Sequence, residues 1–162
     1  MSEKLHNVLF VCTGNSARSI MAEGILNKLG AGRFKAWSAG SHPKGAVHPL
    51  AVEVLERLGM SQSDFRSKSW DEFTQPGAPE LNFVFTVCDN AAGEVCPVWP
   101  AVTAHWGIYD PVAVDGSPER QRQAFNDVAQ VLKRRIELML ALPEPSLASL
   151  SIQSQLNAIG KM

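Results

Sequence analysis

Residues 8–26, VLFVCTGNSARSIMAEGIL, change character at one tight turn. The apolar run at their start predicts a strand over residues 5–12, covered on both faces in a parallel sheet and ending on a cysteine. From Arg18 onward apolar residues recur at helical spacing, which predicts a helix over residues 18–29. In open α/β sheets, a loop between a strand and the next helix opens at the carboxyl edge, where such folds bind ligands. The stretch therefore predicts a ligand-binding loop at residues 12–19.

The rest of the chain continues to alternate between strands and helices. Further strands are predicted at residues 34–38, 81–87 and 101–106, and further helices at residues 49–58, near residue 73 and at residues 117–142. Ser69 and Glu72 have the spacing of a capping box at the start of the short helix near residue 73. This alternation predicts an α/β fold with a doubly wound parallel sheet. Residues 1–142 are expected to form a single domain.

The tail over residues 143–162 differs in character from the domain. Ile152, Leu156 and Ile159 have the spacing of one helix face. Two interpretations stay open at this point: a short helix that docks on the domain or on another copy, and a loosely held terminus.

The composition narrows the class of protein. The chain has 162 residues, of which 45% are apolar and 19% charged, with a net charge of −1. These values indicate a globular protein and give no reason to expect nucleic acid or an acidic membrane surface as partner. The sequence has no secretory signal and no run near the roughly 18 apolar residues of a spanning helix, so a cytoplasmic protein is expected. Thiols are kept reduced in that compartment, which favours catalytic or redox roles for the three cysteines.

The first loop has the chemistry of an oxyanion site with a nucleophile. Backbone amides at a helix N-terminus can ring a tetrahedral oxyanion, and the guanidinium of Arg18 can contact two of its oxygens. The same donors and the helix dipole favour the thiolate form of Cys12, and Ser19 can add a hydroxyl hydrogen bond to the sulfur. The stretch contains neither of the common glycine-rich nucleotide motifs. The candidate oxyanion-binding residues are Thr13, Gly14, Asn15, Ser16, Ala17 and Arg18. The alternative interpretation is a buried cysteine at a strand end and an unrelated surface arginine.

Five stretches resemble one known family, the low-molecular-weight tyrosine phosphatases, and within it the thioredoxin-coupled arsenate reductases. The matching stretches are residues 8–24, 39–40, 48–69, 88–97 and 105–111. The resemblance implies a four-stranded parallel sheet flanked by helices, with an oxyanion in the first loop. In both branches it implies Cys12 as nucleophile, Arg18 as oxyanion clamp and Asp110, in the sequence HWGIYDP, as general acid.

The other two cysteines distinguish the two branches. A phosphatase transfers the phosphoryl group from Cys12 to water, whereas a reductase needs further thiols to supply two electrons. The resemblance implies a relay of Cys12, Cys88 and Cys96, with a thioredoxin-like or glutaredoxin-like protein as external reductant. Ordinary buried thiols or a metal pair are the alternatives for Cys88 and Cys96, although their spacing fits no usual zinc pattern. The relay predicts an arsenate reductase, with phosphate or sulfate as mimics of arsenate.

Two other functions remain as alternatives. A phosphatase of phosphotyrosine or another phosphomonoester is the first, although that branch has a proline soon after the Arg-Ser pair and tyrosines near the acid. Here Ile20 and Met21 follow Ser19, and Tyr109 is the only tyrosine. A non-enzymatic oxyanion sensor is the second, but the retention of a nucleophile and an acid disfavours it.

No organic cofactor is expected. In some relatives a potassium ion lies beside the first loop, and Asn15, Glu23 and Ser38 match its ligands, whereas residues 67–69 depart from that pattern. A purely structural role for Asn15, bracing the loop through backbone hydrogen bonds, is the alternative. His42 and His48, in polar loops near helix starts, are predicted to be solvated or capping residues rather than catalysts.

Overall fold

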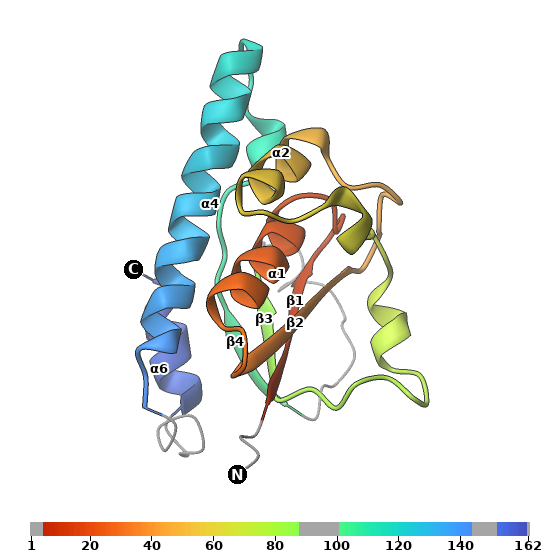
Figure 1. Ribbon diagram of the computed structural model, residues 1–162, viewed down its shortest axis with the longest axis vertical. Helices are drawn as coiled ribbons and strands as arrows, with labels where there is room; N and C mark the ends of the chain where they lie inside the picture. The colour runs from red at the N-terminus through yellow and green to blue at the C-terminus, as the bar shows by residue number, and fades with distance from the viewer. Residues whose placement is uncertain (1–4, 88–100, 144–151, 162) are drawn as a thin grey trace.

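The computed structural model describes residues 5–87, 101–143 and 152–161 and contains one parallel sheet. Its strands are β1 (His6–Cys12), β2 (Phe34–Gly40), β3 (Phe83–Thr86) and β4 (Val102–His105). They lie in the order β2-β1-β3-β4, and each neighbouring pair is parallel (Figure 1). The predicted α/β class with a four-stranded parallel sheet is confirmed.

Helices flank this sheet. The α-helices are α1 (Arg18–Leu29), α2 (Pro49–Arg57), α4 (Pro118–Leu140) and α6 (Ile152–Ile159). Three short 3-10 helices, η1 (Gln62–Asp64), η2 (Trp70–Phe73) and η3 (Pro111–Ala113), lie in the connections. Helix α1 packs between β2 and α4. None of the described helices combines the length and the apolar character needed to span a membrane.

Local sequence signals account for several helix starts. Pro118 follows the N-cap Ser117, whose hydroxyl oxygen accepts a hydrogen bond from the Arg120 N–H. At η2 the Ser69 hydroxyl oxygen caps the helix, but the Glu72 carboxylate pairs with the Arg66 guanidinium in place of the reciprocal bond of a capping box. The capping residue was therefore predicted correctly and its expected partner was not.

The core lies on both sides of the sheet and beneath its carboxyl edge. The rings of Phe10 and Phe85 stack with centroids 5.5 Å apart, and the Phe85 and Trp106 rings lie 4.2 Å apart. The Trp106 indole N–H donates a hydrogen bond to the Leu156 carbonyl oxygen at 2.9 Å, so this buried ring has a polar partner. The helical spacing in α4 buries the residues expected to face the core, Phe125, Val128, Leu132, Ile136 and Met139.

Helix α6 covers the outer side of β4, which is an edge strand of the sheet. The Gln153 side-chain amide donates to the Thr103 carbonyl oxygen at 2.9 Å, and the Asn157 side-chain oxygen accepts from the His105 N–H at 3.0 Å. The apolar face of α6 buries Ile152, Leu156 and Ile159. The described part of the tail is therefore a helix docked on this domain.

Candidate active site

Residues 12–18, named here the oxyanion loop, run from the end of β1 to the first residue of α1 and surround a cavity of about 200 Å³. Cys12 lies in this cavity and is only 3% exposed. The lining residues are Cys12, Thr13, Gly14, Asn15, Ser16, Ala17, Arg18, His42, Lys44 and Asp110. The structure thus brings all the sequence-predicted oxyanion-binding residues together with the expected nucleophile and the expected acid.

A neighbouring stretch, residues 41–48, named here the covering segment, holds the loop from outside. Three hydrogen bonds join His42 N–H to Thr13 O (2.9 Å), Lys44 N–H to Gly14 O (2.9 Å) and His48 N–H to Ser16 O (2.8 Å). In a trans peptide unit, the carbonyl and the following N–H point in opposite directions. The N–H groups of Gly14, Asn15 and Ala17 therefore point away from the covering segment, and the loop is pre-organised to receive an anion.

Asn15 braces the oxyanion loop from within. Its backbone has a φ of 43°, in the left-handed region, and its side chain is fully buried. The side-chain oxygen accepts a hydrogen bond from Lys68 N–H at 2.9 Å, and the side-chain amide donates to the Ser19 hydroxyl oxygen at 2.8 Å. Gly40 approaches the loop so closely that a Cβ there would lie 2.5 Å from the Thr13 carbonyl oxygen.

The Ser19 hydroxyl lies 2.9 Å from the Cys12 sulfur. Because the Asn15 amide already donates to the Ser19 oxygen, the serine proton is available for donation to sulfur. Cys12 is also the first residue of the oxyanion loop, which leads into the N-terminus of α1, where the helix dipole favours negative charge. A hydroxyl donor and a helix N-terminus are surroundings that favour a thiolate, which agrees with the predicted role of Cys12 as nucleophile.

Arg18 and Asp110 face each other across the rim of the cavity. One Arg18 nitrogen donates to the Ile108 carbonyl oxygen at 3.0 Å, and another lies 3.7 Å from an Asp110 carboxylate oxygen. The second Asp110 oxygen accepts from Val112 N–H at 3.0 Å, which makes this residue the N-cap of η3. Pro111 occupies the first helical position, so the Asp-Pro pair itself fixes the direction of the carboxylate. The side chains of Arg18 and Asp110 thus lie together with the buried Cys12 at the oxyanion cavity.

Comparison with known proteins identifies the family of the chain. Residues 7–151 match the family described as low molecular weight phosphotyrosine protein phosphatase. The chain belongs to this family. A Halalkalibacterium halodurans protein named arsenate reductase is 34% identical over 132 residues, which cover 80% of this chain and 91% of the relative.

Two solved structures represent the two activities found in this family. A structure described as an arsenate reductase in the phosphate binding state is 30% identical, with a TM-score of 0.64, and covers 84% of this chain and 97% of its own. The low molecular weight protein tyrosine phosphatase from T. tengcongensis is 28% identical, with a TM-score of 0.65, and covers 85% of this chain and 99% of its own. The overall fold therefore does not separate the reductase branch from the phosphatase branch.

Of the three cysteines, Cys12 alone belongs to the described residues; Cys88 and Cys96 lie outside them. The strand that leads to Cys88 is nevertheless described. Thr86 of β3 lies beside Val11 of β1, and Val87 N–H donates to the Val11 carbonyl oxygen at 2.9 Å. The described chain thus reaches residue 87 next to the strand end that carries Cys12.

The residues that match the family's potassium site form a different polar cluster. The Ser38 hydroxyl donates to a Glu23 carboxylate oxygen at 2.6 Å, and both side chains are buried. Burial raises the pKa of Glu23, while the Ser38 hydrogen bond and the positive charge of Lys68 oppose that rise. Lys68 is itself buried, and its ammonium donates to the Arg66 carbonyl oxygen at 2.9 Å. The Lys68 ammonium already brings a positive charge to the Glu23–Ser38 pair, and the Asn15 side-chain oxygen already accepts a hydrogen bond from the Lys68 backbone. The cluster therefore fits the Lys68 ammonium as its cation better than a potassium ion.

No metal-binding cluster was found elsewhere in the described parts of the chain. Residues 5–87, 101–143 and 152–161 contain no group of three or more histidine, cysteine, aspartate or glutamate side chains placed to hold a metal ion.

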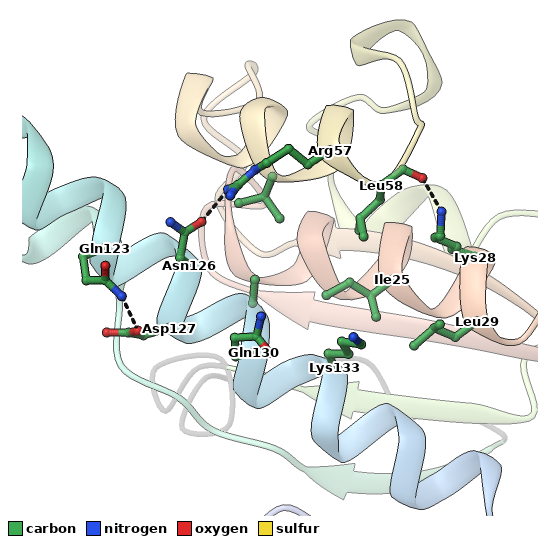
Figure 2. Close-up of a pocket in the computed structure, with 12 residues that line it drawn as sticks. Ile25, Lys28, Leu29, Arg57, Leu58, Gln123, Asn126, Asp127, Gln130 and Lys133 are labelled. Atoms are coloured by element: carbon green, nitrogen blue, oxygen red, sulfur yellow. Dashed lines mark hydrogen bonds between the residues drawn. The ribbon is translucent and has the colours of Figure 1, made fainter.

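A larger groove of about 480 Å³ lies between α1, α2 and α4 (Figure 2). Ile25 and Leu29 from α1 face it, and Gln130 and Lys133 from α4 lie opposite (Figure 2). Its lining contains no cysteine and neither Arg18 nor Asp110. The predicted catalytic residues Cys12, Arg18 and Asp110 line the smaller cavity at the oxyanion loop instead.

Three residues near the loop have roles that sequence patterns reveal only in part. His48 was predicted to be a solvated or a capping residue, and it is a capping residue: its Nδ1 accepts from Leu50 N–H at 3.1 Å at the start of α2. Burial lowers the pKa of His48 and the charge of Lys44 lowers it further, while Asp110 opposes both. The places of His42 and Lys44 in the cavity lining were not predicted. Both residues reach the cavity because backbone hydrogen bonds hold the covering segment against the oxyanion loop. No short sequence motif encodes these hydrogen bonds.

Proposed function

We propose that the protein is an arsenate reductase, which converts arsenate to arsenite with Cys12 as nucleophile and a relay of three thiols. The observation that carries this proposal is a nearly buried cysteine in an anion-binding loop, in a chain with two further cysteines. The relatives named arsenate reductase, at 31–34% identity over most of the chain, support the same reaction.

The first step is formation of a bond between sulfur and arsenic. Arsenate binds to the loop N–H groups and to Arg18, and the Cys12 thiolate attacks arsenic. One hydroxyl group of arsenate leaves, and Asp110 in its protonated form donates a proton to it so that it departs as water. Asp110 is placed at the cavity rim for this proton transfer. Val112 N–H donates a hydrogen bond to one of its side-chain oxygens, and the other oxygen faces Arg18.

The second step reduces arsenic. The Cys88 thiolate attacks the Cys12 sulfur, a Cys12–Cys88 disulfide forms, and the electrons of the sulfur–arsenic bond remain on arsenic. Arsenite, in which arsenic has gained two electrons, is released. Cys96 then attacks Cys88, which frees Cys12 as a thiolate and leaves a Cys88–Cys96 disulfide.

An external dithiol must return two electrons to that disulfide in each cycle. A thioredoxin or glutaredoxin-like protein is the proposed reductant, since both classes reduce protein disulfides by thiol exchange. The proposed location is the cytoplasm, where such reductants keep thiols reduced. We propose no resident metal or organic cofactor for the reaction.

Phosphomonoester hydrolysis is the second candidate function. Its support is the solved tyrosine phosphatase of T. tengcongensis, which matches this chain with a TM-score of 0.65. In that reaction Cys12 would attack the phosphomonoester, Arg18 would bind the phosphoryl group, and Asp110 would protonate the leaving group. Water would then attack the phosphorylated Cys12 and release phosphate. In that reaction neither Cys88 nor Cys96 takes part.

The decisive experiment measures both activities on the same proteins. Wild-type protein is mixed with thioredoxin, thioredoxin reductase and NADPH, and NADPH loss is followed on addition of arsenate; hydrolysis of an aryl phosphate is measured in parallel. The proposal expects arsenate-dependent NADPH loss that Cys88→Ser and Cys96→Ser each abolish. Cys12→Ser is the control that removes both activities.

Two results would contradict the reductase proposal. Full arsenate turnover in the Cys88→Ser protein would exclude the relay. Fast aryl phosphate hydrolysis without arsenate-dependent NADPH loss, with either thioredoxin or glutaredoxin as donor, would establish the phosphatase instead.

A further inference from the structure

Lys44 is a second basic residue of the oxyanion cavity, and neither the sequence motif nor the proposed reaction assigns it a role. Its backbone N–H donates to the Gly14 carbonyl oxygen at 2.9 Å, which fixes the start of the side chain beside the loop. A Cβ built at Gly14 would lie 3.3 Å from Lys44 Cγ and 3.2 Å from Cε. The side chain therefore runs along the loop surface over Gly14 and lines the cavity.

The charges around the cavity leave Lys44 available to an anion. Arg18 shares its guanidinium with the Ile108 carbonyl oxygen and faces the Asp110 carboxylate at 3.7 Å. Among the residues that the structure describes, no carboxylate forms an ion pair with the Lys44 ammonium. Arsenate and phosphate carry two negative charges in their basic form, so one guanidinium already turned toward a carboxylate balances only part of that charge.

Lys44 also has an electrostatic influence on a neighbouring residue, His48. His48 belongs to the same covering segment, and its N–H holds the Ser16 carbonyl oxygen at 2.8 Å. After burial, the charge of Lys44 is the largest influence that lowers the pKa of His48. The ammonium thus acts on groups that contact the loop, and an anion bound in the loop would lie within the same field.

We propose that Lys44 is a specificity-determining residue that binds the outward oxygen of a doubly charged tetrahedral oxyanion and selects it over singly charged forms. For arsenate this inference rests on the proposed function, but binding of the oxyanion itself does not require the relay. The loop amides and Arg18 fix the position of the anion, and Lys44 sets how strongly its second charge is recognised.

The test measures binding of inorganic phosphate by titration calorimetry. Measurements are made at low salt, at one pH where phosphate is mainly a dianion and one where it is mainly a monoanion. The variants are Lys44→Met, which removes the charge and keeps the length, and Lys44→Arg, which keeps the charge. Lys133→Met is the matched control, because it removes the same charge from an exposed position on α4 in the groove of Figure 2.

The expected result is selective loss of dianion binding. Lys44→Met should weaken phosphate binding about tenfold at the higher pH, the size of one charge-assisted contact, and by much less at the lower pH. Sulfate, also a dianion, should lose a similar factor, added salt should shrink the difference, and Lys44→Arg and Lys133→Met should bind like the wild type.

Three results would overturn the inference: wild-type phosphate binding by Lys44→Met, equal weakening at both pH values, or the same loss in Lys133→Met. None of these depends on turnover. Failure of the thiol relay with intact, Lys44-dependent phosphate binding would refute the proposed reductase and leave this inference standing.

Discussion

Replacing Ser19 by alanine tests whether the hydroxyl at 2.9 Å from Cys12 sets the reactivity of the nucleophile. A hydrogen bond to a charged group contributes about 1.5–3 kcal/mol, and a sulfur acceptor places this one near the lower end. Each pH unit corresponds to about 1.4 kcal/mol, so the pH midpoint for alkylation of Cys12 should rise by about one unit in Ser19→Ala. The substitution also leaves the buried Asn15 amide without the acceptor it has at 2.8 Å, which should lower the free energy of unfolding by about 1–3 kcal/mol.

The assay is the rate of iodoacetamide alkylation across pH, with peptide mass spectrometry to separate Cys12 from Cys88 and Cys96. Ser38→Ala is the matched control, because Ser38 is also fully buried but its hydroxyl contacts Glu23 instead of sulfur. It should lose stability without moving the alkylation midpoint. An unchanged midpoint in Ser19→Ala, or an equal shift in Ser38→Ala, would refute the reasoning.

Three other substitutions test separate parts of the structure. Asp110→Asn should lower kcat for arsenate about 100-fold, the usual contribution of a general acid, while inorganic phosphate still binds by calorimetry. Gly40→Ala should lower the free energy of urea unfolding by about 1–3 kcal/mol, because its Cβ would lie 2.5 Å from the Thr13 carbonyl oxygen. Burial raises the pKa of Glu23 in the folded protein above its value in the unfolded chain. The folded protein therefore loses stability as pH rises through this raised pKa and the buried carboxyl group ionises. Glu23→Gln should therefore become more stable relative to wild type from pH 4 to pH 8 in thermal unfolding, and an unchanged difference across this range would contradict the sign.

Local patterns predicted the parts of the molecule whose structure depends on neighbouring residues in the chain. The apolar run before Cys12 and the helical spacing after Arg18 place the oxyanion loop, because both signals come from period and burial alone. Pro118 at the first position of α4 likewise fixes that helix start. Asp110 was singled out as the expected acid by the family resemblance of residues 105–111 and not by a local pattern, and the structure places it in the lining of the cavity.

The supporting contacts could not be predicted, because they join residues far apart in the chain through the backbone. Lys68 braces the loop with its N–H, so its side-chain type carries no signal of the contact to Asn15. The covering segment over residues 41–48 is likewise held by main-chain groups. The apolar spacing around Leu156 fitted two interpretations, and contacts with residues some 50 positions away in sequence, such as the hydrogen bond from the Trp106 indole to the Leu156 carbonyl oxygen, give that helix its place.

The docking of α6 has a consequence for the open edge of the sheet. An edge strand carries a row of unpaired backbone groups that can recruit a strand of another molecule. Two of those groups on β4, the Thr103 carbonyl and the His105 N–H, are bonded by the side chains of Gln153 and Asn157. Helix α6 thus covers part of the β4 edge and blocks its pairing with a strand of another molecule. We expect a chain shortened to residue 143 to keep the oxyanion loop but to expose these two backbone groups of β4, so that light scattering would detect more association between copies than in the full chain.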